Sequence, residues 1–207
     1  MRRLSFILIC LLILTLSGCG QKAQTPPPAA DTPAAETPVT ETPAETPAED
    51  RNPTAAELGR EEKTNLAFTV EGETELIPVT LYIGQGYSIY IPDEGWRLEK
   101  WVDDGIPEDT WESVVNDDVE LTVLHLGEKT LEQAQAWVKA EEDDYQMVED
   151  KQGGLGGTDT EDREVLEVRF HPAGNAMYAV LYKYPMEAAE GFGTRLGVMA
   201  DTFQVME

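Results

Sequence analysis

Met177-Tyr178-Ala179-Val180-Leu181-Tyr182-Lys183-Tyr184 is the stretch that decides the fold of this 207-residue chain. Successive side chains of a strand point to opposite faces of its sheet. One face would carry Tyr178, Val180, Tyr182 and Tyr184, and the other would carry Met177, Ala179 and Leu181. Because both faces are apolar, we expect this strand to lie at the centre of a sheet with hydrophobic core on each side.

Working outward from this strand, period-two patterns predict most of the other elements. Residues 65–83 form an expected β-hairpin, with the turn at Glu71-Gly72-Glu73. Further strands are expected over 87–91, 96–102, 110–115, 119–126, 145–148 and 166–170. The run Gly153-Gly154-Leu155-Gly156-Gly157 predicts a mobile loop, since glycine adds backbone freedom and contributes no side chain to packing.

Two helices complete the pattern. Thr130 with Gln133 three residues later is a capping box and predicts a helix start. Pro185 is expected to open a second helix, in which apolar residues recur at spacings of three and four up to Phe203. The fold class is therefore α+β: a largely antiparallel sheet with two packed helices, preceded by the hairpin.

The chain begins with a targeting segment. Arg2 and Arg3 are followed by an apolar run over 4–16, which is too short to span a bilayer as a stable helix. The run ends in Leu16-Ser17-Gly18-Cys19 and resembles a bacterial lipoprotein signal. That resemblance implies cleavage after Gly18, recognition through Leu16, Ser17 and Gly18, and a diacylglycerol thioether on Cys19. The alternative is a secreted protein in which this cysteine is accidental.

Between the signal and the folded part lies a low-complexity segment. An acid-Thr-Pro unit recurs four times between Asp31 and Pro47, with almost no residue that could enter a core. Proline favours extended backbone and the acids repel one another, so we expect a disordered tether. We expect three parts: a signal peptide over 1–18, lipidated Cys19 and tether over 19–63, and one α+β globular domain over 64–207.

Composition excludes several classes of function. The formal charge is −25, and it becomes −27 when Arg2 and Arg3 leave with the signal, which argues against nucleic-acid binding. The two cysteines are Cys10, inside the signal, and Cys19. The folded part therefore has no thiol for a disulfide, a zinc cluster or a nucleophile. We expect no cofactor.

A second resemblance covers the chain from about Gly86 to the C-terminus and leaves the hairpin outside it. The residues that carry it are Gly86-Tyr87-Ser88-Ile89-Tyr90-Ile91-Pro92 with Trp96, the helix that starts after Thr130, and Ala200-Asp201-Thr202-Phe203. These features resemble the Mog1/PsbP-like fold. Members of that family mostly act as accessory or binding modules, and the resemblance supplies no catalytic residues.

Candidate sites are few. His125 and His171 are expected to be structural or surface histidines. No nucleophile elbow, zinc-protease motif or phosphate loop is present in the sequence. Acid clusters such as Asp117-Asp118 have no EF-hand spacing, so a solvated surface is the main interpretation and weak divalent binding the alternative. We assign no metal ligands. Trp101 and Trp111 are a candidate aromatic ligand surface, with core packing as the alternative.

We therefore expect a monomeric, lipid-anchored binding or accessory module at the outer face of the bacterial cytoplasmic membrane, or at the outer membrane of a Gram-negative envelope. The module would be non-enzymatic, and its partner would be an envelope protein or a small ligand. The alternative is an envelope hydrolase, either metal-dependent or metal-independent, which would require acids and a histidine to converge in one pocket.

Overall fold

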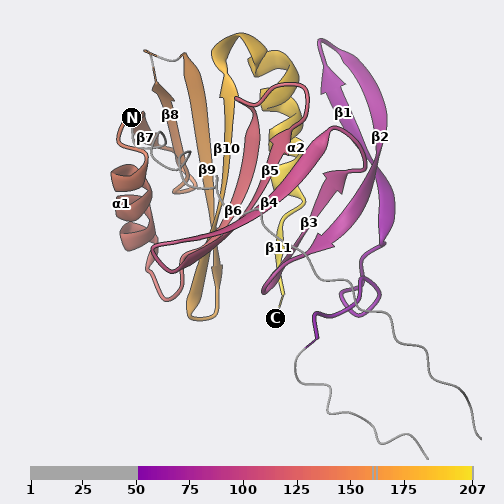
Figure 1. Cartoon of the computed structure of the whole chain (residues 1–207), viewed down its shortest axis with the longest axis horizontal. Helices are drawn as coiled ribbons and strands as arrows, with labels where there is room; N and C mark the ends of the chain where they lie inside the picture. The colour runs from indigo at the N-terminus through magenta and orange to yellow at the C-terminus, as the bar shows by residue number, and fades with distance from the viewer. Residues whose placement is uncertain (1–50, 160, 162, 207) are drawn as a thin grey trace, which may run out of the picture. The chain divides into compact units, whose positions relative to one another are not determined.

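The strand predicted to be central is the middle strand of a seven-stranded antiparallel sheet (Figure 1). The structure is a computed structural model that describes residues 51–159, 161 and 163–206. In spatial order the sheet contains β4 (Trp96–Asp103), β5 (Ile106–Ser113), β6 (Glu120–His125), β10 (Ala176–Pro185), β9 (Glu164–Ala173), β8 (Leu155–Asp159) and β7 (Gln146–Glu149). The two faces of β10 enter two different hydrophobic cores, as its alternation predicts.

The predicted hairpin is present, and it belongs to a second sheet. Strands β1 (Lys63–Val70) and β2 (Glu73–Ile83) pair across a turn in which Glu71 and Gly72 have φ values of 53° and 83°. Both residues thus occupy the left-handed region that tight hairpin turns require. β2 then pairs with β3 (Tyr87–Pro92), and β3 pairs with β11 (Gln204–Val205).

Helix α1 (Leu131–Glu141) begins with the predicted capping box. The Thr130 hydroxyl accepts a hydrogen bond from the Gln133 backbone, and the Gln133 side chain accepts one from the Thr130 backbone. Ala134 and Val138 are its buried residues. They pack in the core that contains Met177, Ala179 and Leu181 of β10, so α1 covers one face of the large sheet.

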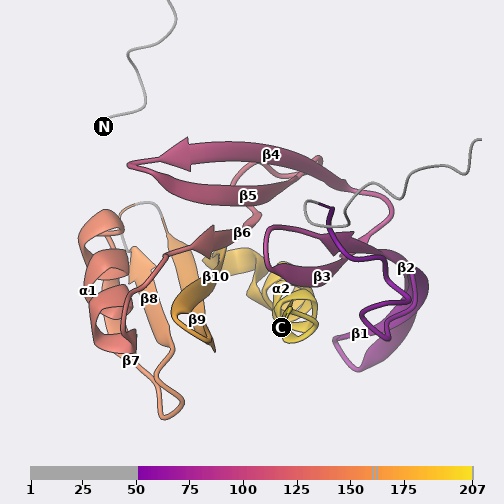
Figure 2. The same cartoon turned by 90° about the horizontal axis from the view of Figure 1, so that it is seen from below.

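The second predicted helix covers the opposite face and has an irregular start. It runs as a 3₁₀ turn (η1, Met186–Ala188), a π-helical turn (η2, Ala189–Gly193) and α2 (Thr194–Asp201). At Gly193 an added Cβ would lie 2.8 Å from a ring atom of Tyr184, so a glycine permits this close packing. Helix α2 contacts β10 of the large sheet and both β1 and β3 of the small one, and Figures 1 and 2 show it between the two sheets.

The prediction of a glycine-rich loop over 153–157 is wrong for its last three residues. Leu155 to Asp159 form strand β8, which pairs with both β7 and β9, and Leu155 is only 2% exposed. An added Cβ at Gly157 would lie 2.9 Å from the Met147 side chain. Gly157 thus allows β7 and β8 to approach closely, whereas the loop prediction rests only on the freedom that glycine gives the backbone.

Residues 51–62, which we call the N-terminal strap, are folded onto the small sheet. Ala55 and Leu58 pack against Val79, Leu81 and Tyr90 on the side of the sheet that faces away from α2. The expected boundary at residue 64, with these residues in a disordered tether, is therefore wrong for the strap. The folded part includes the strap from Arg51 onward, because the strap covers apolar side chains that the small sheet would otherwise expose.

Arg60 attaches the strap to the end of α2. Its guanidinium donates to the buried hydroxyl of Ser88 at 2.7 Å and to the Thr202 carbonyl at 2.9 Å, and it lies over the ring of Tyr90. A carbonyl at the end of a helix lacks an intrahelical partner, so Arg60 satisfies it.

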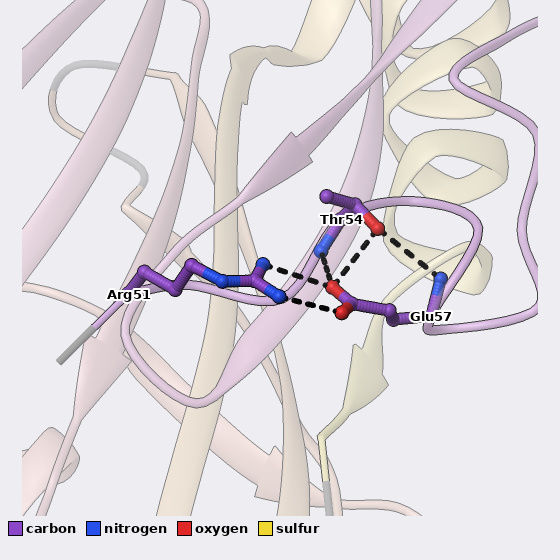
Figure 3. Close-up of polar contacts among 3 residues, drawn as sticks. All are labelled: Arg51, Thr54 and Glu57. Carbon is purple, nitrogen blue, oxygen red and sulfur yellow. Dashed lines mark hydrogen bonds and ion pairs between the residues drawn. The ribbon is translucent and has the colours of Figure 1, made fainter. Parts of the chain in front are cut away.

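An ion pair and a capping box hold together the first residues of the strap (Figure 3). Arg51 donates two hydrogen bonds to Glu57, at 2.7 and 3.0 Å, and Thr54 donates through its backbone N–H and its hydroxyl. The hydrogen bonds from Arg51, followed by those from Thr54, lower the pKa of Glu57 from 4.5 to about 2. All these donors favour the charged form of the carboxylate.

We predict that Glu57 titrates near pH 2 in the folded protein. Its pKa is lowered on folding, so its contribution to stability is present above the unfolded value of 4.5 and is lost as the pH falls toward 2. The measurement is an NMR titration of its side-chain carboxyl. In Arg51→Gln the pKa should rise toward its ordinary value, and a Glu57 pKa near 4.5 in the unmodified chain would contradict the described contacts.

The expected signal peptide and most of the expected tether, residues 1–50, lie outside the described residues. The hydrophobic clusters on both sheets, and the contacts within them, are formed by residues 51–206. A chain that begins at Gly20 therefore retains every one of them. The described part has the predicted α+β class, with antiparallel sheets and two packed helical segments.

Candidate functional site: a pocket between the two sheets

A pocket of about 140 Å³ opens where the two sheets and the C-terminal helical segment meet. Strands β1 and β2 contribute Phe68 and Ile77, and the C-terminal helical segment contributes Phe192, Arg195 and Met199. The remaining lining residues come from the end of β3, the turn after it, the start of β4, and the end of β5 with the segment that follows it: Pro92, Glu94, Gly95, Trp96, Ser113 and Val115. Elements distant in sequence thus form one concave surface, which is mostly apolar.

Local sequence explains how the walls of this pocket are placed. Pro92 ends β3, and Gly95 has a φ of 88°, which turns the chain so that Trp96 starts β4. Alternation in β1 directs Phe68 toward α2 and the main core. Met199 is fully buried on α2, and Phe192 in the π-helical turn packs against the same core.

Arg195 is the only cation among the residues that line the pocket, and Glu94 is the only anion. The Nε atom of Arg195 is buried and has no hydrogen-bond partner among the described residues. Its nearest carboxylate is on Glu75, at 3.6 Å from Nη2, beyond hydrogen-bonding distance. The pocket therefore combines an apolar interior with one cation that still has a free donor.

Sequence reasoning did not find this site, although one signal was available. Arg195 is the single basic residue in the apolar helical stretch from Pro185 to Phe203. A single basic side chain in a largely apolar helix, such as Arg195, can indicate a polar group that faces a pocket. Its neighbours Phe68 and Ile77 belong to a hairpin more than a hundred residues away, so no local pattern could join them to it.

The two tryptophans of the candidate aromatic surface do not form one surface. Trp111 on β5 is 3% exposed and packs edge-on against Tyr82, with ring centroids 4.9 Å apart. Trp101 on β4 is 59% exposed and pairs with Glu108. Trp111 pairs with Leu98, three residues from Trp101, so the two rings lie on opposite faces of the β4–β5 hairpin. Core packing is the correct interpretation for Trp111.

The two histidines belong to an aromatic row in the large sheet. Tyr178 of β10 lies in register with His125 on β6 and His171 on β9, and the His125 ring stacks on Tyr178 at 4.7 Å. Burial lowers the pKa of His125. Burial, followed by the positive charge of Arg169, lowers the pKa of His171. Both shifts favour the neutral imidazoles that aromatic packing accommodates.

Asp109 connects the two sheets through Tyr87, which is buried, and Tyr82, which is half-buried. Its carboxylate accepts hydrogen bonds from Tyr82 of β2 at 2.7 Å and from Tyr87 of β3 at 2.5 Å. Lys100 of β4 forms an ion pair with it at 3.2 Å and also donates to the Tyr82 hydroxyl. Burial, together with the Asp109 carboxylate, raises the pKa of Tyr87, which keeps this phenol a donor. We interpret this network as structural.

A second cavity is polar and acidic. It has a volume of about 430 Å³ and is lined by Asn116, Asp118, Glu164, Pro185, Glu187 and Ala188. Within residues 51–206, apart from 160 and 162, no three histidine, cysteine or acidic side chains are grouped closely enough to hold a metal ion.

The lipid attachment residue Cys19 and the recognition residues Leu16, Ser17 and Gly18 lie outside the described residues. Among the residues that the structure does describe, none of the helices has the length and apolar character needed to cross a membrane.

Comparisons with known proteins give a likeness to solved structures. No protein-family model matches the chain, and no curated protein matches it. The chain is similar to the solution structure of cyanobacterial PsbP (CyanoP) from Synechocystis sp. PCC 6803, with 14% sequence identity and a TM-score of 0.45. The match covers 61% of this chain and 92% of that one. A likeness at this level carries no conclusion about function.

Proposed function

We propose that this protein is a lipid-anchored, non-enzymatic binding module of the bacterial cell envelope, and that the inter-sheet pocket binds a small ligand with an apolar body. The observation that carries the binding function is the pocket itself. Small-molecule sites are typically concave and mostly apolar, with a few polar groups that orient the ligand. The pocket formed by Phe68, Ile77, Trp96 and Met199, with Arg195 beside them, has this character.

The location follows from the N-terminal sequence. The lipid on Cys19 would hold the protein at the outer face of the cytoplasmic membrane, or at the outer membrane of a Gram-negative cell. The Pro-rich segment would separate the domain from the bilayer, and in extended form some thirty residues can span ~90 Å. The pocket would then be open to ligands, or to a partner protein that delivers or receives them, in the extracytoplasmic space.

We predict that the pocket binds a neutral aromatic probe, benzyl alcohol, in a saturable manner. The chain that begins at Gly20 is titrated, and amide shifts are followed by NMR. The largest shifts should map to residues that line the pocket, such as Phe68, Ile77 and Met199. Val115 lines the mouth and is 77% exposed, so Val115→Trp should obstruct the pocket without disturbing the core. If the tryptophan prevents the probe from burying ~60 Å² of apolar surface in the pocket, the affinity should fall about tenfold.

The neighbouring residue provides a matched control. Val114 is also exposed, at 61%, but is absent from the pocket lining, so Val114→Trp should leave the affinity unchanged. The proposed function is contradicted if the probe shifts no pocket residue, or if the two tryptophan variants weaken binding equally.

A further inference from the structure

The arrangement of charge at the inter-sheet pocket indicates which ligands it accepts. We propose that the pocket selects a small monocarboxylate with an aromatic or branched apolar body, and that Arg195 binds the carboxylate. This inference rests on the proposed function of the pocket and adds the chemical class of the ligand.

The first argument is the unsatisfied donor of Arg195. Its buried Nε has no acceptor among the described residues, and a buried donor without a partner is destabilising. A guanidinium presents its N–H groups as a planar fork that matches the two oxygens of a carboxylate. A carboxylate at this position would satisfy Nε and one terminal nitrogen together.

The ion pair between Arg195 and Glu75 does not involve the Nε donor of Arg195. Glu75 lies 3.6 Å from Nη2 of Arg195, and its side chain is 67% exposed, against 40% for Arg195. Exposed ion pairs at this distance contribute little, because water screens the charges. A ligand held in the apolar pocket would meet Arg195 in a drier environment, where a charge-assisted hydrogen bond is stronger.

The interior of the pocket sets the size and polarity of the ligand body. The walls are Phe68, Ile77, Trp96, Phe192 and Met199, and the volume is about 140 Å³. An apolar cavity of ~150 Å³ is known to accommodate benzene. The body that fits is therefore one aromatic ring or a branched aliphatic group of similar size.

The other charges favour a ligand with a single negative charge. Glu94 is the one other ionisable residue of the lining, and the chain as a whole has a formal charge of −25. A second carboxylate on the ligand would meet this negative field with no second cation in the lining to balance it. Arg195 likewise disfavours a cationic ligand.

The test compares ligands of one shape and different charge on the chain that begins at Gly20. Benzoate should bind at least ~10-fold more tightly than benzyl alcohol, since hydrogen bonds to charged groups are worth more than neutral ones. Benzylamine and the dianion isophthalate should both bind more weakly than benzoate. Affinities are measured by NMR titration at fixed ionic strength, with the shifts mapped to the pocket.

Variants then assign the preference to Arg195. Arg195→Met keeps an apolar stem of similar length and should reduce benzoate binding to the level of benzyl alcohol, while benzyl alcohol binding persists. Lys139→Met is the control, because it removes an exposed cation on α1, outside the pocket, and should leave the benzoate preference intact. A thermal melt establishes that each variant is folded.

The outcomes separate the two proposals. If benzoate and benzyl alcohol bind the pocket equally well, the monocarboxylate inference is wrong and the proposed function stands. If neither binds, both are wrong. If Lys139→Met abolishes the preference as fully as Arg195→Met does, general surface charge accounts for it and the assignment to Arg195 fails. If Arg195→Met does not fold, the comparison of the four ligands on the chain with Arg195 still tests the monocarboxylate inference.

Discussion

Replacement of Cys19 by alanine is expected to remove the protein completely from the processed, membrane-bound pool. The proposed thioether to diacylglycerol would need the cysteine sulfur, and alanine provides no atom to which the lipid could be joined. Each buried methylene of a lipid chain contributes ~0.8 kcal/mol, so loss of two chains removes the whole anchoring energy. Membrane fractionation with detection of the cleaved and uncleaved forms measures the result. The folded domain should keep its melting temperature, since all its described contacts lie beyond residue 50.

Cys10 supplies the control for this experiment. It lies within the apolar run of the expected signal peptide, and it leaves with that peptide if cleavage follows Gly18. Cys10→Ala should therefore preserve both cleavage and retention. A processed Cys19→Ala protein that still sediments with the membrane would refute lipid anchoring at this residue and, with it, the proposed location.

Gly86→Ala is expected to destabilise the folded domain by ~2–5 kcal/mol. Gly86 has a φ of 80°, where a side chain is strained by ~1–2 kcal/mol. An added Cβ would also lie 2.2 Å from the hydroxyl oxygen of Tyr178. That ring cannot move freely, because Tyr178 is buried on the central strand and its hydroxyl donates to the Gln85 carbonyl at 2.9 Å. Overpacking of this kind costs a further ~1–3 kcal/mol.

Gly95→Ala separates the two causes. Gly95 has a similar φ of 88°, but an added Cβ there meets no atom within 4 Å. Only the backbone strain remains, so we expect a loss of ~1–2 kcal/mol. The free energies of unfolding are obtained from urea denaturation monitored by circular dichroism. If both variants lose the same free energy of unfolding, the close contact between Tyr178 and residue 86 does not affect stability.

Several features follow from short-range patterns and are confirmed by the structure. Alternation over 177–184 predicts the two faces of β10, and both faces enter a core. The pair Thr130 and Gln133 predicts the start of α1. Glu71-Gly72 predicts the first hairpin turn. The capping box and the turn depend on interactions between residues that are close in sequence, and the alternation in β10 shows by itself that both faces of the strand are apolar.

The candidate site shows where such patterns stop being informative. Alternation tells which residues of a strand share a face, but it does not tell which other strand that face meets. Trp101 and Trp111 therefore look like partners in the sequence, although pairing in the β4–β5 hairpin places them on opposite faces. The pocket depends on Phe68, Trp96 and Arg195 meeting across the two sheets, and nothing local in the sequence joins them.

Residue chemistry alone is sufficient for the class of secondary structure, for the central position of β10 and for the prediction of a lipid anchor at Cys19. Tertiary packing is needed to divide the strands into two sheets, to make Leu155-Gly156-Gly157 part of a strand and to fold the strap with Ala55 and Leu58 onto the small sheet. These features depend on contacts between segments far apart in the chain. Their free energy comes from burying apolar surface that each segment would otherwise expose to water, and that surface has a partner only in the folded domain.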